Sequence, residues 1–102
     1  MDSSLIPMSK VSIVAERLLE DRLVAAIREA GAKGYTIVDA RGEGSRGVRA
    51  SEFEGLNIKL ETLVPEETAE QILEHLAKHY FARYAVVAYV EQVYVVRGDK
   101  YL

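Results

Sequence analysis

The sequence contains no cysteine, so disulfide bonds, thiolate metal sites and thiol nucleophiles are all excluded. An excess of basic residues is also missing, and the net charge of −3 argues against a general nucleic-acid-binding protein. Residues 1–9 lack the basic cluster and the long apolar core of a signal peptide or a membrane span. What the chain does have is 49% apolar residues in a length of 102, which is enough for one packed domain. We therefore expect a cytoplasmic protein with no nucleic-acid partner.

Hydrophobic periodicity predicts secondary structure in the order β-α-β-β-α-β. Strands are predicted over residues 10–16, 34–40, 56–61 and 84–96, and helices from Arg17 to a stop at Gly31 and from Pro65 to near Arg83. The last segment is long for one strand, so we expect it to be bent or bulged near Glu91 and Gln92. This order indicates an α+β fold, the ferredoxin-like βαββαβ plait, in residues 10–102 after a flexible N-terminus of residues 1–9.

Two helices can cover only one face of a four-stranded sheet, yet the last predicted strand is apolar on both faces. Val86, Ala88 and Val90 point one way, and Val87 and Tyr89 point the other way. A monomer would leave the second face exposed, at a cost of roughly 25 cal/mol for each Å² of apolar area. The sequence therefore predicts a symmetric homo-oligomer that packs through this face.

The segment that joins the second and third predicted strands is rich in glycine and arginine. Its centre is Gly-Glu-Gly-Ser-Arg-Gly-Val-Arg over residues 42–49, a literal G-x-G-x-x-G. A dinucleotide-binding fold needs a helix directly after these glycines, and here a strand follows instead. We interpret residues 41–55 as a long mobile loop that can wrap a phosphorylated ligand, because glycines free backbone N–H groups and arginines bind phosphate in pairs of hydrogen bonds. From the residues alone, solvated surface arginines explain the loop equally well.

Three stretches of the sequence resemble the PII-like signalling proteins. They are Gly31-Ala32-Lys33-Gly34-Tyr35-Thr36, the glycine-arginine segment of residues 42–49, and Lys78-His79-Tyr80-Phe81-Ala82-Arg83-Tyr84-Ala85. The likeness is strongest to the branch of that family that regulates the cyanobacterial sodium-dependent bicarbonate transporter. It implies a homotrimer with nucleotide clefts between subunits that senses cyclic AMP, AMP, ADP and ATP. Acidic residues around the loop leave Mg²⁺ beside ATP as a further option. It also implies that the long loop docks on the transporter, which would place the protein at the membrane when bound.

The resemblance assigns roles to residues of this sequence. Arg46 and Arg49, with Gly44 and Ser45 beside them, would hold phosphate. The start of the second strand would line the base and ribose with Gly34, Tyr35 and Thr36. The last strand would contact adenine, largely through its backbone, at Val87, Ala88 and Tyr89. Several relatives carry a C-terminal cysteine pair linked to redox control and nucleotide hydrolysis. This chain has no cysteine, so we expect neither that pair nor the activities linked to it here.

Two further residues of the sequence are candidates for a partner contact or an interface. Phe53 lies between two glutamates in the loop, where an aromatic side chain has little purpose unless it docks on a partner, and we group it with Arg46 as partner-binding. Strand alternation points Lys59 away from the helices. An ion pair with Glu61 of a neighbouring subunit and a contact to phosphate are both compatible with that position.

Signals for catalysis or metal binding are weak. His75 and His79 are four residues apart on the second predicted helix and could share a metal, but no third ligand is evident, so we interpret them as surface histidines. No paired carboxylates or serine–histidine arrangement indicates an active site, and we predict no catalytic residues. The alternatives to a nucleotide sensor are a slow nucleotide phosphohydrolase that uses the same loop, and a plait used only for assembly or metal handling.

Overall fold

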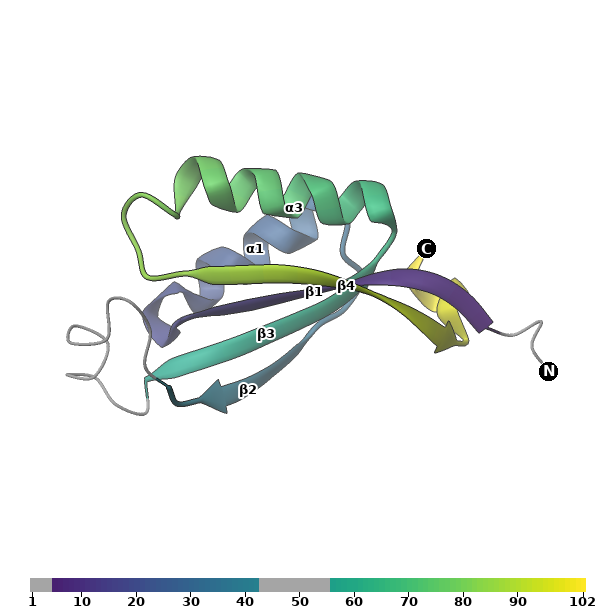
Figure 1. Ribbon diagram of the computed structural model, residues 1–102, viewed down its shortest axis with the longest axis horizontal. Coiled ribbons are helices and arrows are strands. Elements are labelled where there is room, and N and C mark those ends of the chain that lie inside the picture. The colour runs from purple at the N-terminus through teal and green to yellow at the C-terminus, as the bar shows by residue number, and fades with distance from the viewer. Residues whose placement is uncertain (1–4, 43–55) are drawn as a thin grey trace.

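The computed structural model describes residues 5–42 and 56–102. It has an α+β fold in which two helices cover one face of a four-stranded antiparallel sheet (Figure 1). The elements are β1 (Leu5–Glu16), η2 (Arg17–Leu19), α1 (Glu20–Ala30), β2 (Thr36–Ala40), β3 (Asn57–Val64), α3 (Glu66–His79), β4 (Val87–Val96) and η3 (Gly98–Tyr101). The strand order is β2-β3-β1-β4, so β2 and β4 form the two edges. The predicted ferredoxin-like βαββαβ plait is therefore confirmed.

Local sequence explains where the helices begin and end. α1 ends at Gly31, whose φ of 120° suits a residue without a Cβ, and its N–H bonds to the carbonyl of Arg28 at 3.0 Å. α3 starts directly after Pro65, which lacks the N–H that a first turn would leave unpaired. Glu66 and Glu67 occupy that first turn, where the helix dipole favours acids.

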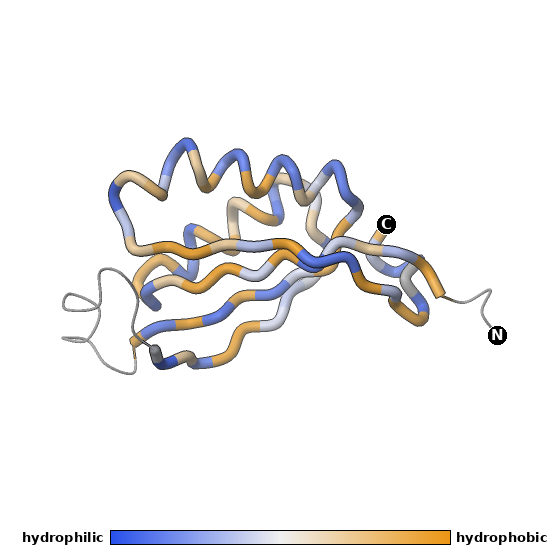
Figure 2. Tube along the Cα trace, in the orientation of Figure 1, coloured by the Kyte–Doolittle hydropathy of each residue, from blue (hydrophilic) through white to orange (hydrophobic). Residues whose placement is uncertain are grey.

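The core lies between the helices and the sheet face that they cover. On the sheet it is built from alternate residues of β1 and β3, among them Ile13 and Leu60, both fully buried. α1 contributes Leu23 and Ile27, and α3 contributes residues such as Leu76. The hydropathy trace shows the same division, with apolar positions recurring along the strands and polar positions on the outer turns of α3 (Figure 2).

Several boundaries differ from the sequence-based expectation. α1 begins at Glu20 after the short η2, β3 continues to Val64 instead of residue 61, and α3 ends at His79 instead of near Arg83. β1 begins at Leu5, so residues 5–9, predicted as flexible, belong to the strand. β2 begins at Thr36 and β4 at Val87, later than the predicted residues 34 and 84. The early start of β1 follows from its pairing with β4, which continues to Leu5 opposite Val96 and which local patterning of the N-terminal residues does not show. Pro7 is tolerated there because β1 pairs with β3 only from Ser9 onward.

The predicted bulge near Glu91 and Gln92 is not present. The register of β1 and β4 runs without interruption from Leu5–Val96 to Val14–Val87, so each residue opposes one partner. The paired ends of the two strands instead curve together beyond the ends of β2 and β3 (Figure 1). β4 can thus be 10 residues long without a bulge, because β1 is long enough to pair with all of it.

Candidate functional site

The sheet face that the helices leave uncovered carries three of the predicted site residues, Thr36, Val87 and Tyr89, and we call it the open face. Its side chains form rows across the four strands, because the pairing registers align them. One row consists of Thr36, Glu61, Ser12 and Tyr89, and the next consists of Val38, Lys59, Val14 and Val87. The rows place predicted site residues from β2 and β4 at the same height on the sheet.

Thr36 and Tyr89 lie at opposite ends of one row, and the structure does not bring them into contact. Three strand spacings separate them, or about 14 Å, since neighbouring strands lie about 4.8 Å apart. Val87 occupies the same edge as Tyr89 and is 57% exposed. A ligand that touches both β2 and β4 must therefore bridge the sheet or lie where two chains meet.

Ala88 differs from its neighbours because its side chain faces the helices and packs against the core. The side chain of Ala88 is therefore not available to a ligand on the open face. Among the described residues β4 pairs with β1 alone, so its outer edge presents backbone N–H and C=O groups without a strand partner. Such groups can recognise the edge of a purine base, since they offer both donors and acceptors.

Gly34 and Tyr35 lie in the connection that leads into β2. The carbonyl of Gly34 accepts a hydrogen bond of 2.6 Å from the buried Thr62 hydroxyl, which fixes the start of the strand. A Cβ at Gly34 would meet nothing within 4 Å, so the fold itself does not require glycine there. Tyr35 is partly exposed, and the Arg28 guanidinium lies 5.4 Å from its ring centre, a cation–π contact. The aromatic side chain is held beside a positive charge, an environment that suits an anionic ligand.

The centre of the open face is polar, which the sequence analysis left undecided. Lys59 Nζ lies 3.2 Å from a carboxylate oxygen of Glu61 in the same chain. Hydrogen bonds to Glu61 and then to Tyr89 raise the pKa of Lys59 above its ordinary value. Ser12 is fully buried between Glu61 and Tyr89 in its row, and within the described residues its hydroxyl has no hydrogen-bond partner. The signal in the sequence for this polar group was the presence of charged residues at alternate positions of β3, Lys59 and Glu61, on the side opposite the buried Ile58 and Leu60.

The other predicted site residues, Gly44, Ser45, Arg46, Arg49 and Phe53, lie outside the described residues. The chain enters their segment after β2 and leaves it before β3, at one end of the sheet. Beside this exit is a cavity of about 300 Å³, lined by Glu16, Arg17, Leu18 and Leu56. Arg17 is paired there with Asp39 of β2, and its backbone N–H bonds to the carbonyl of Leu56. These contacts anchor both ends of the connection to the turn after β1.

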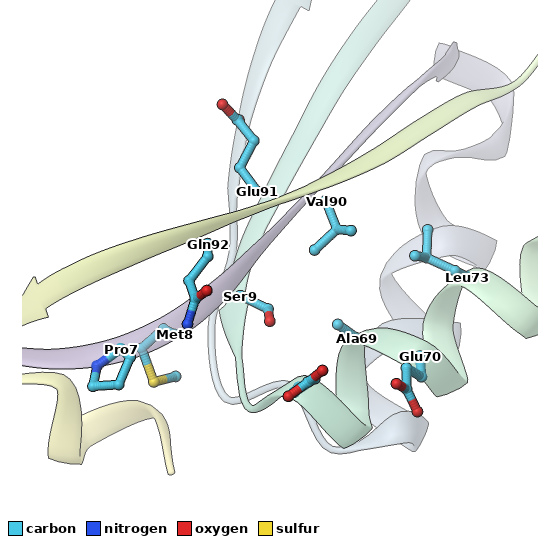
Figure 3. A pocket seen from close by; sticks show the side chains of 10 residues that line it. Pro7, Met8, Ser9, Ala69, Glu70, Leu73, Val90, Glu91 and Gln92 are labelled. Carbon is cyan, nitrogen blue, oxygen red and sulfur yellow. The ribbon is translucent and has the colours of Figure 1, made fainter.

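A second cavity, of about 390 Å³, lies between the first half of α3 and the β1–β4 pair (Figure 3). Val90 and Leu73 point into it, whereas Glu91 points to the opposite side of β4. Its lining includes Glu66 and Glu70, whose carboxylates would repel a phosphate. It contains none of the predicted nucleotide-binding residues, so we do not assign the nucleotide to it.

In the described part of the chain, no three His, Cys, Asp or Glu side chains converge in a way that could hold a metal ion. Within residues 5–42 and 56–102, no helix has both the length and the apolarity needed to cross a lipid bilayer. The described site is thus a pair of strand edges with a polar centre between them, and it offers binding groups for an uncharged base and for an anion.

Comparison with known proteins identifies the family. Residues 8–100 match the model of the nitrogen regulatory protein P-II family, and the chain therefore belongs to this family. A protein from Thermus thermophilus described as a PII-like signalling protein is 60% identical, with a TM-score of 0.85 and coverage of 97% of this chain and 99% of that chain.

Two other solved structures extend the comparison. CPII from Thiomonas intermedia, bound to ADP and bicarbonate, is 30% identical with a TM-score of 0.84, covering 96% of this chain and 97% of that chain. The complex of B. subtilis GlnK with ATP shares the fold, with 17% identity, a TM-score of 0.64 and coverage of 85% of this chain and 82% of that chain. The chain is thus a PII-like protein whose relative CPII binds an adenine nucleotide together with bicarbonate.

Proposed function

We propose that this protein is a regulator that senses adenine nucleotides in clefts between the subunits of a homotrimer. The ligands are ADP, AMP, ATP and cyclic AMP, with Mg²⁺ accompanying ATP. The observation that carries the proposal is the likeness to CPII, which spans 96% of this chain and whose structure holds ADP and bicarbonate. The outer edge of β4, which pairs with no strand in residues 5–42 and 56–102, and the Tyr35–Arg28 pair supply groups of the required chemistry.

The proposed site combines the described residues with the loop arginines. Arg46 and Arg49, flanked by Gly44 and Ser45, hold the phosphates. Gly34, Tyr35 and Thr36 line the base and ribose side, and the backbone of Val87, Ala88 and Tyr89 contacts adenine. Because Gly34 is not required by the fold, a ligand that approaches the backbone closely accounts for the glycine.

The regulated partner in this proposal is a membrane transporter for bicarbonate, contacted from the cytoplasmic side through Arg46 and Phe53. A ligand that binds one loop arrangement better than another shifts the loop population and hence the affinity for the transporter. The bicarbonate in the CPII complex supports inorganic carbon as the regulated nutrient.

Binding of ADP and bicarbonate is the direct test of the proposed function. We expect isothermal titration of the intact chain to give saturable ADP binding, and we expect a change in ADP affinity when bicarbonate replaces chloride at equal ionic strength. Matched titrations with AMP, ATP plus Mg²⁺ and cyclic AMP rank the ligands, and phosphate release from ATP is followed in the same samples. Absence of binding for all four nucleotides would contradict the sensor, and steady turnover of ATP would favour the phosphohydrolase.

Assembly through the open face is tested separately by a charge in β4. Val87 is 57% exposed on the open face, so the Val87→Lys substitution would bury an ammonium group in the proposed interface without a partner. We expect light scattering after gel filtration to give a trimer for the natural chain and a monomer for Val87→Lys at micromolar concentration. Val90→Lys is the matched control, because Val90 lies on the same strand, is 44% exposed and faces α3. A trimeric Val87→Lys protein would contradict assembly through this face.

A further inference from the structure

Two histidines lie side by side on the last turns of α3. His75 and His79 are one helical turn apart, a spacing that places both side chains on the same side of a helix. Their ring centroids are 4.6 Å apart, and the ring planes are tilted by 44°, so the rings are neighbours but are not stacked in parallel. No part of the proposed nucleotide site involves them, since they lie in the helical layer and the open face is on the other side of the sheet.

A cluster of aromatic residues behind the pair restrains His75. The His75 ring lies 5.9 Å from the ring of Tyr80, which is 5% exposed, and Tyr80 in turn lies 5.8 Å from Tyr84. Arg22 of α1 joins this cluster from the opposite helix. Its guanidinium lies 5.6 Å from the Tyr80 ring centre and donates a hydrogen bond of 3.3 Å to the Tyr84 hydroxyl. The imidazole of His75 therefore lies beside a cluster of packed side chains. This restricts its rotamers, so less conformational entropy is lost when a ligand binds it.

The separation of the two rings fits a shared metal ion. A metal bound to two imidazoles at about 2.0–2.1 Å places the two nitrogens roughly 3 Å apart and the ring centres behind them roughly 4–5 Å apart. The observed separation of the ring centres, 4.6 Å, lies in this interval. Neutral imidazole nitrogens are good ligands for copper, nickel and zinc, and affinity for such sites generally rises from nickel to copper and falls again at zinc.

We propose that His75 and His79 form a binding site for a divalent transition metal ion on the outer surface of α3. The two imidazoles supply two ligands, and water completes the coordination, so the ion remains exchangeable. In the described residues no third His, Cys, Asp or Glu joins the pair, which distinguishes this site from a closed structural zinc site. The site lies beyond the proposed function and does not depend on it.

The test is titration of the untagged chain with Cu²⁺, Ni²⁺ and Zn²⁺ at pH 7.5 by calorimetry. We expect one ion per chain, with copper bound most tightly. His75→Ala and His79→Ala should each lower the affinity by at least about 10–100-fold, the range that even the loss of an outer-shell partner of a metal ligand typically costs. Lys78→Ala in the same turn is the control and should bind as the natural chain does.

A second variant keeps two histidines but separates them. Combining His79→Ala with Ala77→His leaves the histidine count unchanged, yet positions 75 and 77 do not face each other on a helix. We expect this protein to lose the site while keeping its helical circular dichroism. Equal metal affinity in the natural chain and in either the single or the combined variant would overturn the proposal, as would the absence of metal binding by the natural chain. ADP titration of the same variants should be unchanged, which separates this site from the nucleotide site.

Discussion

Replacing Arg46 and Arg49 with alanine is expected to abolish most of the affinity for ADP. A hydrogen bond to a charged group contributes about 1.5–3 kcal/mol. Because about 1.4 kcal/mol corresponds to a tenfold change in Kd, each single substitution should weaken ADP binding by roughly 10–100-fold. The double variant should exceed either single one, although two arginines on one phosphate group are not additive in general. Isothermal titration with ADP measures all three.

Two comparisons make this result specific. Lys78→Ala removes a positive charge from α3, on the far side of the sheet, and should change ADP affinity by less than about twofold. Arg46→Lys keeps the charge but loses the planar fork that binds phosphate through two parallel hydrogen bonds, so its affinity should lie between those of the natural protein and Arg46→Ala. If Arg46→Ala and Arg49→Ala both bind ADP as tightly as Lys78→Ala does, the phosphate is held elsewhere and the proposed role of the two arginines is wrong.

Replacing Leu60 with alanine is expected to lower the free energy of unfolding by about 2–5 kcal/mol. Leu60 is fully buried in the centre of β3, where it contacts the core formed by β1, α1 and α3. Its truncation removes apolar contacts and leaves a cavity that a close-packed core closes only in part. A domain of this size has a total stability of about 5–15 kcal/mol, so the loss is a large share of it.

The control for Leu60 is the same substitution at an exposed leucine. Leu18 is 72% exposed in η2, so Leu18→Ala should change stability by about 0.5 kcal/mol or less. Urea denaturation at fixed protein concentration compares the two variants, because oligomer stability depends on concentration. Equal midpoints for Leu60→Ala and Leu18→Ala would mean that the core does not lie between this face of β3 and the helices.

Most of the fold could be predicted from the sequence because the two α-helices and the four strands have clear local patterns. The alternation from Asn57 onward identifies β3, and Gly31 and Pro65 mark helix ends through backbone chemistry that is specific to glycine and proline. The early start of β1 at Leu5 could not be predicted this way. Residues 5–9 are a strand because β4 pairs with them, and a long-range pairing leaves no signature in the residues of one segment.

For the candidate site, the sequence indicated which residues to consider but not how they are arranged in space. Glycines and arginines in the loop indicated phosphate binding, and the family resemblance supplied the remaining residues. The polar centre of the open face was not predicted, since Lys59, Glu61 and Tyr89 come from two strands whose register is set by pairing through β1. The same register places Thr36 and Tyr89 in one row but at opposite edges of the sheet.

The sequence by itself determined the order of elements and the apolar faces, because these depend on residue type and on spacing along the chain. Only the tertiary structure decided which strands became edges, and thereby which backbone groups lack a strand partner in the part of the chain that it describes. It also decided that His75 lies beside an aromatic cluster that Arg22 completes from the other helix. Both outcomes depend on contacts between residues far apart in the chain, which form only when the helices and strands pack together.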